Sequence, residues 1–97
     1  MALDGQLEIR IKRAPQGMEV LKAIRGVTQH SMADINAAIK NQTPLYVGRL
    51  FHSEHEETRR IAFKLFRELD KTGAEFDVVL DGEPETVEYV KNVIREF

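Results

Sequence analysis

The stretch that decides the fold is Val20-Leu21-Lys22-Ala23-Ile24-Arg25-Gly26-Val27-Thr28, followed by Ser31-Met32-Ala33-Asp34-Ile35-Asn36-Ala37-Ala38-Ile39. Apolar residues recur at helical spacing in both parts. Ser31 with Asp34 three residues later is a variant of the capping box, which marks the start of a helix. We therefore predict two helices, at about 18–27 and 31–41, joined by a Gly/Thr break and ended by Pro44.

The segment before these helices alternates between apolar and charged residues. Leu7, Ile9 and Ile11 fall on one side of an extended chain, so residues 7–13 are predicted to form a half-buried strand. Residues 45–51 and 74–80 are rich in β-forming side chains and predict two further strands, the first weakened by Gly48. A turn is predicted at 81–84.

The second half of the chain contains two more helical patterns. Ser53 with Glu56 is a full capping box, so we predict a helix from there to about Lys71 that closes on Gly73. Its cations Arg60, Lys64 and Arg67 lie opposite its apolar side. A last helix, at 85–97, has an apolar side formed by Val87, Val90, Ile94 and Phe97. We expect that side to pack over an exposed part of the sheet or against a second copy of the chain.

These elements predict an α+β fold with the order β-α-α-β-α-β. We expect a sandwich in which a three-stranded, largely antiparallel sheet carries helices on one face. An added C-terminal helix follows. The length of 97 residues fits a single domain, 1–97, with a core at 6–80 and the appended helix at 85–97.

Composition and charge indicate the cellular location and the kinds of surface that we expect for this chain. It has no cysteine, no leader-like N-terminus and no apolar run of membrane-spanning length, so we expect a cytoplasmic protein without membrane association. The net charge of -2 is unevenly divided. Residues 1–51 carry seven Lys/Arg against four Asp/Glu, whereas residues 52–97 carry seven against twelve. This division predicts a basic face from the first half and an acidic one from the second.

No catalytic motif is present in the sequence. It has no Gly-rich phosphate loop, no nucleophile elbow and no Cys/His pair, so we expect neither an enzyme nor a bound cofactor. His52 and His55, with Glu56, come nearest to a metal-ligand set, but the two histidines lack a third ligand at suitable spacing because His52 precedes the predicted helix cap. We therefore interpret them as polar side chains at the start of a helix. His30 is interpreted as a loop residue.

Residues 20–28, the second helix ending at Pro44, and Gly73-Ala74-Glu75-Phe76-Asp77-Val78 resemble the C-terminal domain of the bacterial ribosomal large-subunit stalk protein. The resemblance covers roughly residues 6–80 and implies the β-α-α-β-α-β fold. In that family the exposed residues of the first two helices recruit translational GTPases, and Leu21, Lys22 and Arg25 match that surface by position. The step between the helices differs, because this chain has Gln29-His30-Ser31-Met32 where the family has Gly-Leu-Gly-Leu.

Residues 16–20 are also similar to the entry segment of the Clp protease adaptor, which has the same general fold. This chain has Ala14-Pro15 where that family has the Asn-Asp pair that holds a substrate's free amine. The second resemblance therefore implies the fold without degron recognition.

The leading hypothesis is a non-enzymatic protein-interaction module, an adaptor or inhibitor-like protein. Its contact surface is the outward side of the first two helices, formed by Leu21, Lys22, Arg25, Met32 and Asn36. The alternative is a nucleic-acid- or ribosome-associated protein that binds through the basic N-terminal half. A third possibility is a homodimer through the C-terminal helix.

Overall fold

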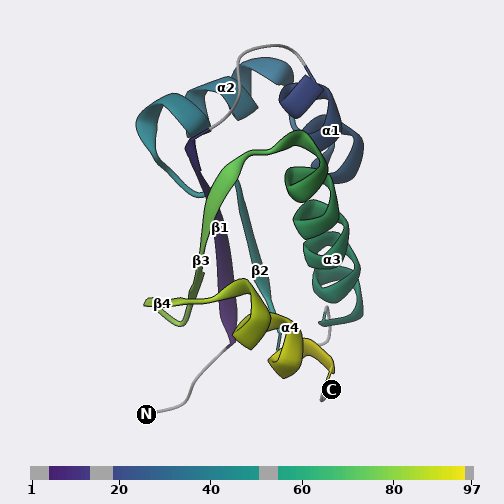
Figure 1. Cartoon of the computed structure of the whole chain (residues 1–97), viewed down its shortest axis with the longest axis vertical. Coiled ribbons are helices and arrows are strands. Elements are labelled where there is room, and N and C mark those ends of the chain that lie inside the picture. Colours follow the sequence, from purple (N-terminus) through teal and green to yellow (C-terminus); the bar gives the residue numbers. More distant parts are fainter. Residues whose placement is uncertain (1–4, 14–18, 51–54, 96–97) are drawn as a thin grey trace.

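The computed structural model describes residues 5–13, 19–50 and 55–95, and it is an α+β fold built on a four-stranded antiparallel sheet (Figure 1). The strand order is β2-β1-β3-β4. The elements, in chain order, are β1 (Gln6–Arg13), α1 (Glu19–Thr28), α2 (Met32–Asn41), β2 (Tyr46–Arg49), α3 (His55–Thr72), β3 (Glu75–Leu80), β4 (Glu83–Glu85) and α4 (Val87–Arg95).

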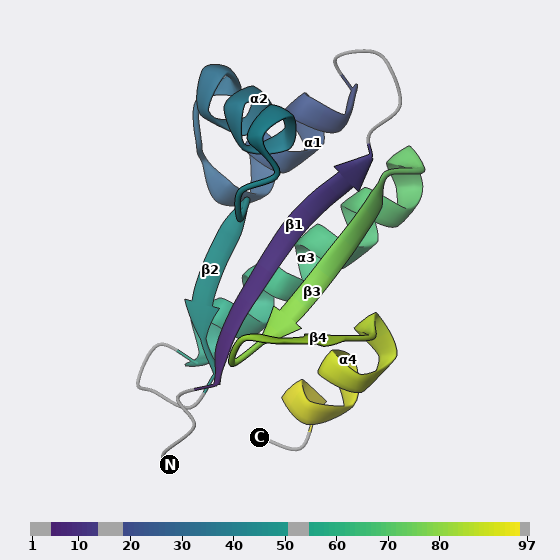
Figure 2. The ribbon, with the colours of Figure 1, turned by 90° about the vertical axis from the view of Figure 1, so that its left-hand side faces the viewer.

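The alternating pattern of the central strand β1 explains why one face of the sheet is covered by a helix. Its alternating residues Leu7, Ile9 and Ile11 are buried, as the pattern predicts. They share the hydrophobic core with the apolar side of α3, which contributes Ala62, Leu65, Phe66 and Leu69. Helix α3 lies along this face, and Figure 2 shows the opposite face of β1 and β3 with no described helix across it. That open face presents charged residues of the two strands.

The sheet has one strand more than the three predicted, because the predicted turn at 81–84 contains part of β4. The turn itself is only Asp81-Gly82, with φ of 51° and 83°. These left-handed values fit the two-residue hairpin loop for which Asp-Gly is a common sequence. Leu80 pairs with Glu83, and Val79 with Pro84. Pro84 is tolerated because β4 is an edge strand, where a missing N–H group need not break the ladder.

The helix boundaries agree closely with the sequence pattern. The backbone N–H of Asp34 donates to Ser31 Oγ at 3.1 Å, so the predicted cap of α2 is confirmed. Gln42 ends this helix in a left-handed conformation, with φ of 58°. Gly73, with φ of 77°, follows α3 as a C′ residue. The predicted cap Ser53 lies outside the described residues.

Helix α4 packs on its own chain, which is the first of the two arrangements expected for it. Val90 and Ile94 are buried in the common core, and Val87 is partly buried against it. The helix lies beside β3 and α3 (Figures 1 and 2). Phe97 lies outside the described residues. Among the helices in the described ranges, none combines the length and apolar character needed to cross a bilayer.

Candidate basic groove

The five predicted contact residues lie on two helices and differ in exposure. On α1, Lys22 and Arg25 are exposed, whereas Leu21 is partly buried against the core. On α2, Asn36 is exposed and Met32 is half-buried. Two of the five side chains therefore offer only part of their apolar surface to a partner, and the accessible chemistry is mainly that of Lys22, Arg25 and Asn36.

Lys22 faces a helix that the sequence hypothesis did not include. It lines a hollow of about 360 Å³ between α1 and α3. The α1 side of this hollow consists of Lys22, Ala23, Gly26 and Val27, and the α3 side of Lys64, Arg67 and Glu68. Exposed Gly26 has no side chain to fill the space. The contact surface predicted on α1 therefore continues onto α3.

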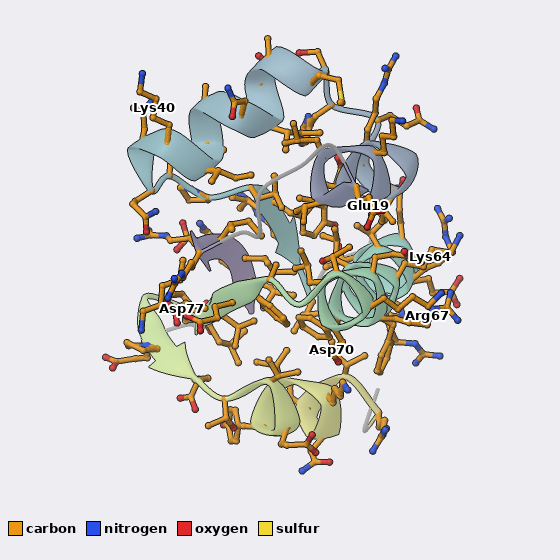
Figure 3. The ribbon with its side chains drawn as sticks, turned by 45° about the horizontal axis from the view of Figure 1, so that its top comes forward. Glu19, Lys40, Lys64, Arg67, Asp70 and Asp77 are labelled. Atoms are coloured by element: carbon orange, nitrogen blue, oxygen red, sulfur yellow. The ribbon has the colours of Figure 1, made fainter. Side chains whose placement is uncertain are left out.

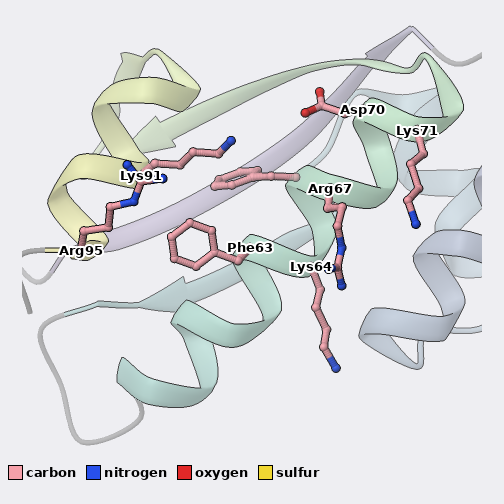
Figure 4. Close-up of a pocket in the computed structure, with 8 residues that line it drawn as sticks. Phe63, Lys64, Arg67, Asp70, Lys71, Lys91 and Arg95 are labelled. Atoms are coloured by element: carbon pink, nitrogen blue, oxygen red, sulfur yellow. The ribbon is translucent and has the colours of Figure 1, made fainter.

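A second hollow, of about 510 Å³, lies between α3 and α4 (Figure 4). Its lining residues are Phe63, Lys64, Phe66, Arg67, Asp70, Lys71, Lys91 and Arg95. Lys64 and Arg67 line both hollows, so the two form one continuous surface. We call this surface the basic groove. Its cations are Lys22, Lys64, Arg67, Lys71, Lys91 and Arg95.

The positive charge of the basic groove is largely uncompensated. Among the residues that the structure describes, six cationic side chains line it against two carboxylates, Glu68 and Asp70. Lys71 forms an ion pair with Glu68 at 3.7 Å. For the other five cations, no carboxylate within the described ranges lies at ion-pair distance. Clustered charges of one sign along a concave surface attract a ligand of the opposite sign, so the groove suits an anion.

The floor of the groove is aromatic. Phe66 is 1 % exposed and stacks on Phe76 of β3, with ring centroids 5.9 Å apart and an interplanar angle of 16°. Phe63, one turn earlier on α3, is half-buried and reaches the groove surface (Figure 4). Phe66 is therefore held by the core, and Phe63 is the aromatic side chain that a ligand would meet.

The charge division between the two halves of the sequence did not predict this groove. Five of its six cations come from residues 52–97, the half with the acidic balance. The contact surface predicted from the sequence included none of these five cations, which are Lys64, Arg67, Lys71, Lys91 and Arg95. One signal was available, because Lys64, Arg67 and Lys71 recur at helical spacing, and so do Lys91 and Arg95. What the spacing did not reveal is that α4 docks beside α3.

Two cations of the first half, Arg10 and Lys40, lie away from Lys22. Arg10 lies on the open face of the sheet, where its guanidinium is 3.6 Å from the Glu8 carboxylate. Lys40 is at the end of α2, across the molecule from Lys64 and Arg67 (Figure 3). The basic face predicted from the N-terminal half is therefore divided between different surfaces.

No metal centre is formed by the part of the chain that the structure describes, because no three His, Asp or Glu side chains come together there. His52 lies outside the described residues. His30 is exposed in the break between α1 and α2, where its backbone N–H donates to Thr28 Oγ1 at 3.4 Å. This position agrees with its interpretation as a loop residue.

Comparisons of the chain with protein-family models, curated proteins and solved structures find no match. The resemblance to the stalk-protein domain therefore stays a prediction.

Proposed function

We propose that this chain is a non-enzymatic protein-interaction module that binds an acidic segment of a protein partner through α1 and the adjoining side of α3. One observation carries the proposal. Lys22 of α1 lies in the same hollow as Lys64 and Arg67 of α3, and none of the three has a carboxylate at ion-pair distance within the described residues. Complementary charge of this kind steers association and favours particular partners.

The residues predicted on the first two helices take distinct roles in this proposal. Lys22 and Arg25 supply exposed charge, and Leu21 supplies the apolar surface that it does not use in the core. Met32 and Asn36 extend the contact onto α2. An apolar centre within a polar rim is the usual arrangement of a protein interface. The resemblance of residues 20–28 to the stalk-protein domain adds support for this side of the molecule. The absence of cysteine agrees with a reducing compartment such as the cytoplasm.

A nucleic-acid ligand is the second candidate function. The same uncompensated cations that attract carboxylates also attract phosphates. This alternative uses the basic groove rather than the N-terminal half of the chain, because the cations of that half are dispersed. A homodimer through the apolar side of α4 requires that helix to leave the core, where Val90 and Ile94 are buried.

The deciding experiment is affinity capture from a lysate of the source organism with three forms of the chain. They are wild type, a Lys22→Glu/Arg25→Glu variant, and a Lys12→Glu/Lys40→Glu variant. The last changes the net charge equally at exposed residues outside the groove. Each form is used with and without nuclease treatment. We expect wild type and the control to enrich the same discrete protein, and Lys22→Glu/Arg25→Glu to lose it.

Two outcomes would contradict the proposal. Equal capture by all three forms would show that α1 is not part of the contact surface. Enrichment that disappears after nuclease treatment would favour nucleic acid as the ligand. Thermal unfolding of the three forms provides the folding control, because exposed charge substitutions are expected to change stability by only about 0.5 kcal/mol.

A further inference from the structure

We propose that the α3–α4 part of the basic groove binds a short acidic peptide segment that also carries a large apolar side chain. The apolar side chain sits against Phe63, and the carboxylates pair with Lys64 and Arg67 on one side and with Lys91 and Arg95 on the other. This inference rests on the proposed function, because it specifies the chemistry of the partner that the module binds.

The arrangement of the cations supports an elongated anionic ligand. Lys64 and Arg67 come from α3, whereas Lys91 and Arg95 come from α4, so cations of two different helices border the groove around Phe63 (Figure 4). None of these four cations has a carboxylate within ion-pair distance in the described ranges. A ligand with carboxylates on both sides of a central apolar group would satisfy both borders at once.

The floor of the groove supplies the apolar contact. Phe63 is half-buried, and the neighbouring Phe66 is fixed by its stacking on Phe76. The hollow of about 510 Å³ lies within the size range of ligand pockets. It therefore has room for one large side chain and part of the backbone that carries it. An apolar side chain that covers Phe63 would also desolvate the surrounding ion pairs and strengthen them.

A nucleic acid fits the same surface less well. Binding of single strands relies on aromatic faces on which successive bases stack. Among the described residues that line the groove, one such side chain is accessible, Phe63, because Phe66 is buried under its own stacking contact. Asp70, a carboxylate, also lines the groove. A phosphodiester chain carries a charge at every nucleotide, whereas a peptide can place its carboxylates away from Asp70.

The test uses three fluorescein-labelled probes of similar length in anisotropy titrations of the full chain. The first is a peptide with one Leu among Glu residues, the second has Ser in place of that Leu, and the third is an oligothymidylate. We expect the Glu/Leu peptide to bind best. Loss of the Leu contact should weaken binding at least about tenfold, because the Ser peptide has no large apolar side chain to bury against Phe63.

Variants locate the site on the molecule. Arg67→Glu/Arg95→Glu replaces one exposed cation on each side of the groove and should weaken Glu/Leu binding at least about tenfold. The matched control, Lys12→Glu/Lys40→Glu, should change it less than about twofold. Amide chemical shifts of the wild-type protein give a second readout that needs no variant. Addition of the Glu/Leu peptide should shift the signals of Phe63, Lys91 and Arg95.

Three results would overturn this inference. They are tighter binding of the oligothymidylate than of the Glu/Leu peptide, equal affinity of Arg67→Glu/Arg95→Glu and wild type, and shifts confined to residues outside the groove. The proposed function fails separately. If lysate capture still depends on Lys22 and Arg25 while the peptide does not bind, only the groove ligand is wrong. If the peptide binds while the Lys22→Glu/Arg25→Glu variant captures the same protein as wild type, only the placement on α1 is wrong.

Discussion

Gly48 of β2 and Thr58 of α3 lie so close together that a Cβ atom at position 48 would be 2.6 Å from Thr58 Cγ2 and 2.9 Å from Thr58 Oγ1. Thr58 is 2 % exposed and has little room to move away. The first turns of α3 therefore pack directly on the backbone of β2. In the sequence, Gly48 predicts a weakened strand. In the structure, it is the residue that allows the helix and the strand to meet.

Gly48→Ala should lower the free energy of unfolding by about 1–3 kcal/mol, the usual cost of overpacking a filled site. Urea denaturation measures the change. Part of the loss should be recovered in Gly48→Ala/Thr58→Ser, because Thr58 Cγ2 is one of the two atoms nearest to the added methyl group, the Tyr46 hydroxyl oxygen being the other, each at 2.6 Å. A Gly48→Ala variant as stable as wild type would show that α3 and β2 separate without cost.

The carboxylate of Asp81 joins the β3–β4 turn to the start of β1. The backbone N–H groups of Gly5 and Gln6 donate to Asp81 Oδ2 and Oδ1, at 3.2 and 3.0 Å. Asp81 also has a left-handed backbone, with φ of 51°. Asp81→Ala should therefore destabilise the fold by about 1–3 kcal/mol in thermal or urea unfolding. Asp81→Asn keeps one acceptor and a residue that tolerates this conformation, so it should cost less. Equal losses of stability in Asp81→Ala and Asp81→Asn would contradict a role for both the retained acceptor and the left-handed backbone.

Ser31 is the N-cap of α2 and accepts a hydrogen bond from the backbone N–H of Asp34. Ser31→Ala should lower stability by about 1 kcal/mol, because that N–H group would lose its side-chain partner. Ser31→Thr keeps the hydroxyl and should cost much less. Circular dichroism during thermal unfolding would measure both variants. Equal midpoints for Ala and Thr would contradict the importance of this cap.

The packing of α4 can be tested with two neighbouring residues. Val90 is fully buried, whereas Tyr89 is 49 % exposed. Val90→Asp places a carboxylate in the core and should cost about 3 kcal/mol or more, while Tyr89→Asp should cost less than about 1 kcal/mol. Unfolding of both variants, together with light scattering of wild type over a range of concentrations, checks the result. A mass that rises toward two chains, with both variants equally stable, would favour the homodimer.

The sequence predicts most of the elements because their apolar periodicity is regular. Leu7, Ile9 and Ile11 mark β1, and the Ser31 cap places the start of α2. The short strand β4 was missed because Pro84 is unfavourable in a strand, although Asp81-Gly82 is a known hairpin sequence. The α3–α4 part of the groove was missed for a different reason. Periodicity shows which side of a helix is apolar, but not which neighbour it packs beside.

The position of β1 has a consequence for the order in which the chain can fold. This strand is near the N-terminus, yet it lies in the middle of the sheet, where Leu7 pairs with Gly48 on one side and with Leu80 on the other. The second pairing closes a loop of most of the chain, and closing long loops slows folding. During synthesis, β1 must therefore wait with one edge unpaired until β3 has left the ribosome. For this interval the exposed strand is open to pairing with other chains.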